Sequence, residues 1–224
     1  MAAPVLPPPL REGDRLTREE FLRRWEAMPD LKHAELIDGI VHMPSPVKLE
    51  HSDLHFRLGG WLSYYAARTI GCRGGTEGTW IMDGKNVPQP DLTLRILPEH
   101  GGQSRVEDDY PVGAPELALE VSLSSRSRDL AVKLRLYERS GVREYLTAIA
   151  NSEQFVWREL VNGKYRAITP GRDGIFRCRH FPGLWLDAVA LWAWDQGRLF
   201  DVLQQGIATP EHAEFVHKPA ARKR

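Results

Sequence analysis

The sequence has few cysteines and no excess of charge of either sign. Only Cys72 and Cys178 occur among its 224 residues, which is too few for a disulfide framework or a cysteine-based zinc site. We expect two buried or incidental thiols. The 30 basic and 30 acidic side chains balance, so the whole molecule lacks the long-range attraction for polyanions that a strongly basic DNA-binding protein has. Any binding of nucleic acid must be local.

Long apolar runs are also missing. No stretch approaches the roughly 18 residues needed to span a bilayer, and residues 1–10 have neither a charged start nor an apolar signal core. These absences predict a cytoplasmic protein. The composition, 42% hydrophobic and 9% aromatic, is that of a globular chain with one sizeable core. We expect one domain over residues 15–205, after a flexible proline-rich arm (1–14) and before a mobile basic tail (206–224).

The order of elements predicts an α/β fold. A capping-box pattern at Thr17 and Glu20 begins a helix that runs to about Met28, and Asp38-Gly39 is a strong hairpin-turn signal. Apolar spacing predicts a long helix over 50–67 and another ending before Gly141, with Ser124, Ser125 and Ser127 as candidate N-caps. Strands are expected at 80–82, 91–96, 117–121, 144–149, 154–160 and 165–168. The polar segment 98–115 is expected to be a long mobile loop.

Two acids occupy positions where the chain otherwise favours burial. Asp91 begins one apolar strand, and Glu120 interrupts the apolar run 117–121. Burying a charge costs several kcal/mol unless a cation or donor compensates it, and neighbouring strands would bring the two side chains together. Oxygen ligands favour a hard ion such as Mg²⁺. Lys133 shares a helix face with Leu134 and Tyr137, so it points toward the sheet. Metal-dependent phosphodiester chemistry is therefore predicted, with Lys133 orienting or deprotonating a water or offsetting phosphate charge.

Each of these residues also has an ordinary structural interpretation. Asp91 could cap the end of its strand, and Glu120 could be a buried acid paired with Arg126. Lys133 could extend to solvent along its helix. An acid at the entry to the first hairpin, Glu35, could form a salt bridge with Lys32 or Lys48.

Two histidines one helical turn apart, His51 and His55, superficially match a zinc-protease helix. Ser52 stands where such a helix needs glutamate, and no third ligand is evident. We expect a pair of histidines near the cleft, with His51 touching substrate. The tryptophans, including Trp185, Trp192 and Trp194, are expected to build the core and a subunit contact.

Together these residues carry a family resemblance. Pro90-Asp91, Glu120-Val121-Ser122 and Lys133 resemble the motif of the PD-(D/E)XK nuclease superfamily, specifically the Uma-type restriction endonucleases. The resemblance covers roughly residues 15–200. It extends to these further positions: 35–39, His51, Ser124-Ser125, Asp129, Tyr137, Gly141-Val142, Glu144-Tyr145 and 182–184. It implies a restriction-endonuclease-like mixed β-sheet flanked by α-helices.

The resemblance also implies roles. Asp91 and Glu120 would bind Mg²⁺, or Mn²⁺ in its place, with the Val121 carbonyl as a third ligand. Glu35 would be an additional catalytic acid, and Lys133 would replace the superfamily lysine usually found where this chain has Ser122. The residues that we expect to contact substrate are His51, Ser122 and Arg126. The chain departs from the pattern at Leu123 and at Leu146-Thr147-Ala148, which leaves the shape of the site open.

The resulting hypothesis is a metal-dependent endonuclease that hydrolyses DNA and acts as a homodimer. One alternative is a nucleic-acid-binding or partner-binding module on the same fold with little catalysis. Another is a metal-dependent phosphoesterase that acts on RNA or small nucleotides.

Overall fold

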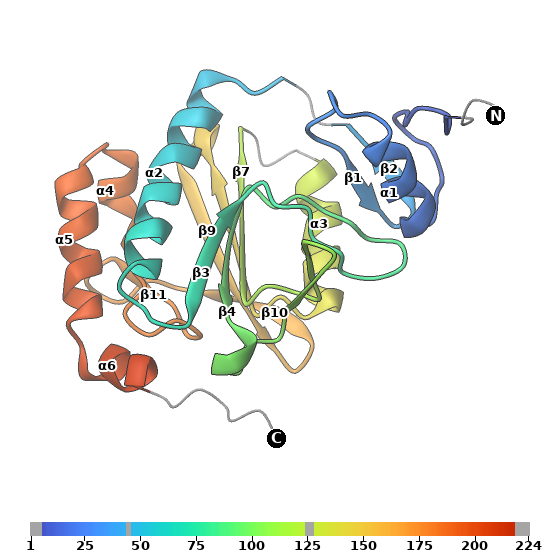
Figure 1. Ribbon diagram of the computed structural model, residues 1–224. Coiled ribbons are helices and arrows are strands. Elements are labelled where there is room, and N and C mark those ends of the chain that lie inside the picture. The colour runs from blue at the N-terminus through green and yellow to red at the C-terminus, as the bar shows by residue number, and fades with distance from the viewer. Residues whose placement is uncertain (1–5, 44–45, 124–127, 218–224) are drawn as a thin grey trace.

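A six-stranded sheet forms the centre of the computed structural model, which describes residues 6–43, 46–123 and 128–217 (Figure 1). Its strands, in the order β10-β9-β8-β7-β4-β3, are β3 (Cys72–Thr76), β4 (Leu92–Ile96), β7 (Leu117–Ser122), β8 (Glu144–Ile149), β9 (Gln154–Val161) and β10 (Lys164–Ile168). The pair β7 and β8 is parallel, and the other neighbouring pairs are antiparallel. The predicted mixed sheet is confirmed.

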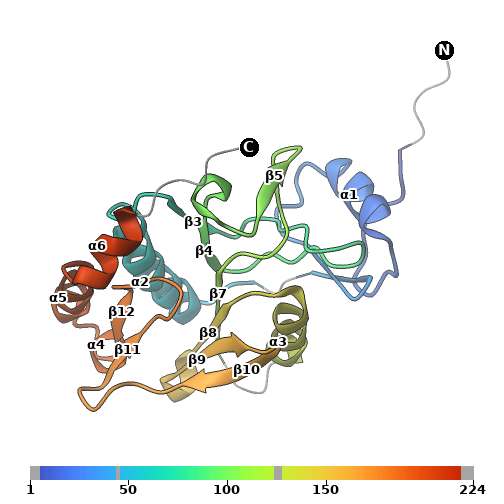
Figure 2. The same ribbon diagram turned by 90° about the horizontal axis from the view of Figure 1, so that it is seen from below.

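Helices cover both faces of this sheet. Helix α2 (Leu49–Ala66) packs on one face and α3 (Arg128–Ser140) on the other, as Figures 1 and 2 show. Side chains alternate between faces along a strand, so Leu119 and Val121 join the core under α2 while Ala118 joins the core under α3. Glu120 consequently points toward α3. Parallel strands need a long connection, and α3 forms that connection between β7 and β8.

A C-terminal layer packs outside α2. It consists of β11 (Ile175–Arg177), β12 (Trp185–Asp187), α4 (Ala188–Trp192), α5 (Gln196–Ile207) and α6 (Pro210–His217). The indole of Trp61 on α2 donates to the Trp185 carbonyl at 2.8 Å, and buried apolar residues of α5 complete this core. Helix α6 stands where the sequence predicts the start of the basic tail; residues 218–224 of that tail lie outside the described residues.

The N-terminal unit consists of α1 (Arg18–Glu26), β1 (Glu35–Ile37) and β2 (Ile40–His42). Thr17 accepts a hydrogen bond from the Glu20 N–H, which confirms the predicted N-cap, whereas the Glu20 carboxylate pairs with arginines instead of closing the box. Asp38 and Gly39 both have positive φ, +54° and +75°, as a two-residue hairpin turn requires. Leu36 and Val87 exchange main-chain hydrogen bonds, which attach this unit to the chain just before β4.

Two predictions of local structure are wrong. The expected loop 98–115 contains a short helix, η1 (Pro98–His100), and a hairpin of β5 (Arg105–Glu107) and β6 (Tyr110–Val112). The expected strand at 80–82 forms only isolated bridges, for example between Ile81 and Val112. A second short helix, η2 (Ala150–Ser152), follows β8.

Cys72 and Cys178 are both buried and free, as expected. Within the described part of the chain, no helix has the length and apolar composition required to cross a membrane.

Candidate active site

The two acids predicted from the strand pattern lie side by side. Leu92 pairs with Leu119 in antiparallel register, so Asp91, one residue before β4, stands opposite Glu120. Asp91 Oδ2 accepts a hydrogen bond from the Val121 N–H at 2.6 Å. The residue Glu120 is 4% exposed, whereas the Asp91 side chain is 18% exposed. The Glu120 carboxylate is therefore buried within the sheet, and the Asp91 carboxylate is the more accessible of the two, at the start of β4.

Lys133 brings its ammonium group between two acids. Its Nζ lies 3.1 Å and 3.0 Å from the two carboxylate oxygens of Glu120, and 3.0 Å from Glu35 Oε1. The lysine is buried, so it does not extend to solvent. Glu35 pairs with this buried lysine, and Lys32 donates instead to the Pro29 carbonyl.

The N-terminal unit positions Glu35. Its Oε1 also accepts from the Gln89 main-chain N–H at 2.6 Å, and the Gln89 side-chain oxygen accepts from Ala34 N–H at 3.2 Å. Gln89 belongs to the Q-P-D segment that ends at Asp91. The segment before β4 therefore contains one acid, Asp91, and holds a second acid, Glu35, through a hydrogen bond from Gln89.

Tyr137 is a member of this site whose contact the sequence did not predict. It lies one helical turn after Lys133 on α3, and its hydroxyl donates to Glu120 Oε1 at 2.6 Å. The phenol is buried, which raises its pKa well above the usual value, so it remains a proton donor to the carboxylate. Glu120 thus has both oxygens engaged by groups from α3.

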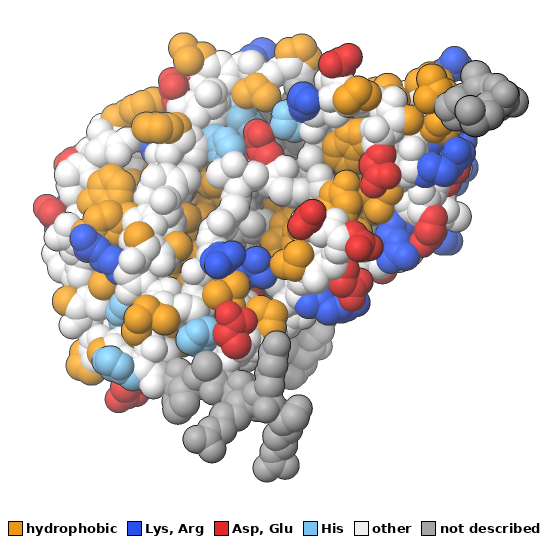
Figure 3. All heavy atoms as spheres, in the orientation of Figure 1, with side chains coloured by type: hydrophobic (Ala, Val, Ile, Leu, Met, Phe, Trp, Pro, Cys, Tyr) orange, Lys and Arg blue, Asp and Glu red, His pale blue; other side chains and the backbone are white. Residues whose placement is uncertain are grey.

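Histidines from α2 approach Asp91 from the opposite face of the sheet. His51 Nε2 lies 3.7 Å from Asp91 Oδ1, and His55 Nε2 lies 2.9 Å from the Asp91 main-chain oxygen. In Figure 3, histidine side chains gather beside an acidic side chain over the first turns of α2. The contact with substrate that the sequence predicts for His51 stays a prediction. Ser122 is the last residue of β7, and Arg126 lies outside the described residues.

The site holds more negative than positive charge. Burial raises the pKa of Glu120 to about 8; Lys133 opposes that shift, while the charges of Asp91 and Glu35 reinforce it. Burial lowers the pKa of Lys133, but the three carboxylates together raise it well above its usual value. Three carboxylates around one ammonium group form an arrangement that a further cation would stabilise.

The donor set suits a metal held by few protein ligands. Among the described residues, no group of three His, Cys, Asp or Glu side chains is arranged to hold an ion. Asp91 Oδ1 and Glu120 are nevertheless adjacent oxygen donors, and Mg²⁺ is commonly held by one or two carboxylates, with water and phosphate oxygens as its other ligands. The residues present therefore fit Mg²⁺ better than zinc, or better than any ion that needs a complete set of protein ligands.

Comparison with known proteins identifies the family. The family model described as "Uma2: Putative restriction endonuclease" matches residues 18–189. The chain belongs to the Uma2 family. A solved structure titled "putative nuclease belonging to DUF820", from Anabaena variabilis, matches the Uma2 chain with a TM-score of 0.62 at 17% identity, covering 80% of this chain and 98% of the other. No curated protein matches the sequence.

These matches confirm the predicted family and the restriction-endonuclease-like fold. The Uma2 family and the nuclease-like fold support assignment of this protein as a nuclease. The geometry brings together Glu35, Asp91, Glu120 and Lys133, whose individual roles remain predictions.

Proposed function

We propose that this Uma2 protein is a Mg²⁺-dependent endonuclease that hydrolyses DNA phosphodiester bonds. The observation that carries the proposal is the buried Lys133 ammonium held between Glu120 and Glu35, next to the more accessible Asp91. Burying such groups costs several kcal/mol. A module that only binds nucleic acid gains nothing from this cost, because acids facing a phosphate repel it.

Asp91 and Glu120 would hold the metal ion, with the Val121 carbonyl as the further ligand that the family resemblance implies. When bound, Mg²⁺ neutralises charge on the phosphate and lowers the pKa of a coordinated water. The excess negative charge around Glu120 supports this assignment, since a divalent cation would compensate it.

Side chains of the protein would orient the attacking water and the substrate. Lys133 stays protonated, because the carboxylates raise its pKa, so it acts as a donor that orients the attacking water or offsets phosphate charge. Glu35 fixes the position of Nζ at 3.0 Å, and Tyr137 fixes the Glu120 carboxylate at 2.6 Å. His51 Nε2 lies 3.7 Å from Asp91 Oδ1 and would contact substrate beside the proposed metal ligand.

The test is cleavage of supercoiled plasmid in Mg²⁺, then in Mn²⁺. We expect nicking or linearisation by wild type, and its loss in Asp91→Ala and in Lys133→Met. Lys164→Met is the matched control, because Lys164 is an exposed lysine on β10 that pairs with Glu138. Cleavage that survives in Asp91→Ala and Lys133→Met would show that other residues, or a contaminant, cut the DNA.

A second readout tests the metal site apart from catalysis. Mg²⁺ that binds only the folded state raises the melting temperature, and we expect this rise in wild type but not in Asp91→Ala. A rise with no cleavage of plasmid, but with cleavage of RNA, would favour the phosphoesterase alternative. Nucleic-acid binding with neither a rise nor cleavage would favour the binding module.

We also propose that the protein works as a homodimer. With 30 basic and 30 acidic residues, one subunit offers little net attraction for DNA, and a dimer would add contacts on a second site. Light scattering coupled to gel filtration measures this directly, and a monomeric mass in the presence of DNA would refute it.

A further inference from the structure

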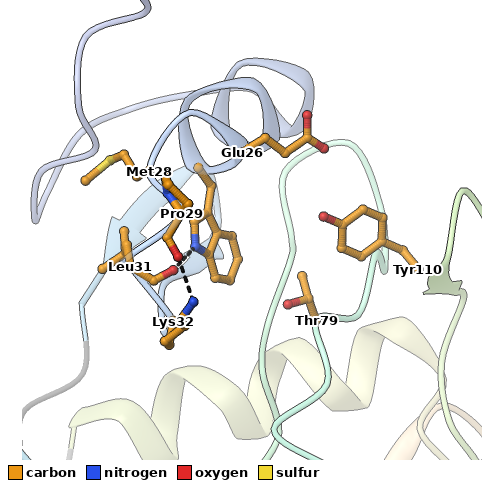
Figure 4. A pocket seen from close by; sticks show the side chains of 8 residues that line it. Glu26, Met28, Pro29, Leu31, Lys32, Thr79 and Tyr110 are labelled. Atoms are coloured by element: carbon orange, nitrogen blue, oxygen red, sulfur yellow. Dashed lines mark hydrogen bonds between the residues drawn. The ribbon is translucent and has the colours of Figure 1, made fainter.

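A recess lies between the N-terminal unit and the β5–β6 hairpin, outside the acidic cluster formed by Glu35, Asp91 and Glu120. Its volume is about 220 Å³, below the roughly 300–1,000 Å³ typical of sites for drug-sized ligands. Figure 4 shows Tyr110 across the recess from Leu31 and Lys32, with Thr79 between them. The space suits one small planar group.

Two aromatic rings line this recess. Trp25 is held in place, because its Nε1 donates to the Leu31 carbonyl at 2.8 Å and its ring meets Phe21 edge-on at 5.3 Å. Tyr110 comes from β6, far from Trp25 in the sequence. Aromatic side chains are a common platform for a nucleobase, and such stacking contributes about 1–3 kcal/mol per base.

Polar groups at the rim match the edge of a base. In the part of the chain that the structure describes, neither the Tyr110 hydroxyl nor the Glu26 carboxylate has a hydrogen-bond partner. Thr79 Oγ1 accepts from Gln89 Nε2 at 3.0 Å, which leaves its own proton for a ligand. A carboxylate such as Glu26 can accept from an exocyclic amino group, which adenine, cytosine and guanine have and thymine lacks.

Hydrogen bonds of Gln89 link one residue of the recess to one residue of the acidic cluster. Gln89 contacts Thr79 through its side chain and Glu35 through its main-chain N–H. Glu35 in turn contacts Lys133. The recess and the acidic cluster therefore share Gln89 as a supporting residue, and the proposal places one nucleic-acid strand against both.

We propose that this recess binds one unpaired nucleobase of the nucleic acid whose backbone lies at the acidic cluster. The base stacks on Tyr110 and Trp25, and Glu26 favours bases with an exocyclic amino group. The proposal rests on the nuclease function and adds a substrate class to it: DNA containing an unpaired or extruded nucleotide.

The test measures binding without cleavage. Five fluorescent DNA hairpins carry one unpaired position in the stem, occupied by adenine, cytosine, guanine, thymine or an abasic sugar, and anisotropy is recorded in EDTA with the full chain. We expect wild type to bind the four base-containing probes roughly tenfold more tightly than the abasic probe, as loss of one stacked base predicts. The three probes with amino groups should bind several-fold more tightly than the thymine probe.

Variants assign the effect to the recess. Tyr110→Ala should abolish the preference for a base over the abasic sugar, and Tyr110→Phe should retain it. Glu26→Gln should remove only the preference over thymine. Tyr64→Ala is the matched control, since Tyr64 is a partly buried tyrosine on α2 that packs on Phe200.

Several results would overturn the proposal: equal binding of all five probes, no binding of any, or a base preference that survives in Tyr110→Ala. Its failure is distinct from failure of the nuclease assignment. Plasmid cleavage without base preference would reject the recess alone, whereas base preference without cleavage would reject catalysis alone.

Discussion

Two buried glutamates on neighbouring strands differ in what surrounds them. Glu120 on β7 and Glu144 on β8 are 4% and 0% exposed, so both have lost most of their hydration. Burial alone therefore does not distinguish a catalytic acid from a structural one. The two acids differ in the groups that replace water around each carboxylate.

Glu144 is surrounded by hydrogen-bond donors. It accepts from the main-chain N–H groups of Arg179 and His180 at 2.8 Å and 2.6 Å, from His180 Nδ1, and from the Trp157 indole. These donors compensate its burial and attach β8 to the segment before β12. Glu144 thus acts as a structural acid.

Glu120, in contrast, shares its surroundings with two more acids. Lys133 and Tyr137 satisfy its oxygens, yet Asp91 and Glu35 add like charge nearby, and the pKa of Glu120 rises to about 8. An ionised Glu120 in these surroundings is destabilising unless a further cation, in addition to Lys133, compensates the three negative charges. The comparison indicates that surplus negative charge, rather than burial, distinguishes the candidate site from a structural acid.

The largest expected effect on cleavage comes from replacing each of the two glutamates with glutamine, which changes the same carboxylate to an amide in both. Glu120→Gln should lower plasmid cleavage by roughly 10²–10³-fold or more, because it removes the charge that we propose binds the metal ion. Glu144→Gln should leave cleavage per folded molecule near the wild-type rate. Initial rates normalised to folded protein provide the measurement, and equal losses in both variants would contradict the distinction.

Truncation of Glu144, the structural acid, should lower the free energy of unfolding. Glu144→Ala leaves several buried donors unpaired, so we expect a loss of about 3 kcal/mol in the free energy of unfolding. Urea unfolding of the metal-free protein measures this loss. A loss below about 1 kcal/mol would mean that water or another group readily replaces the carboxylate.

A smaller effect should appear as a dependence of stability on pH. Since folding raises the pKa of Glu120 from near 4.5 to about 8, its contribution is fully present below pH 4.5 and is lost as pH rises toward 8. In EDTA the free energy of unfolding should fall over this window by at most about 1.4 kcal/mol per pH unit. Other groups titrate in the same window, so the comparison is with Glu120→Gln, where the fall should be reduced. Unfolding curves at pH 5, 6.5 and 8 decide the matter; identical slopes in the two proteins would refute the assigned pKa.

The strands that hold the acids could be predicted from the sequence, because their alternation and turn residues agree with the final fold. The β5–β6 hairpin could not, since its turn residues Asp108 and Asp109 adopt positive φ without the glycine that signals such a turn. Strand β3 was also missed. Its Gly74-Gly75 pair is unfavourable in an isolated strand, and pairing with β4 determines its structure.

Within the site, the charged residues were more predictable than their partners. Glu120 was conspicuous because it interrupts an apolar run, and Asp91 because it begins a strand. Tyr137 was not, because a tyrosine at helical spacing is usually an ordinary core residue. Gln89 and His55 contribute through main-chain contacts, which residue type does not reveal.

The attachment of the N-terminal unit has a consequence for when the enzyme becomes competent. Asp91, Glu120 and Lys133 come from one continuous part of the chain, but Glu35 reaches them only when Leu36 and Val87 pair. The central sheet does not depend on that pairing for its own hydrogen bonds. Undocking of the β1–β2 hairpin would leave the sheet intact and deprive Lys133 of one of its two carboxylate partners. A newly made chain would therefore carry an incomplete candidate site until this hairpin had docked.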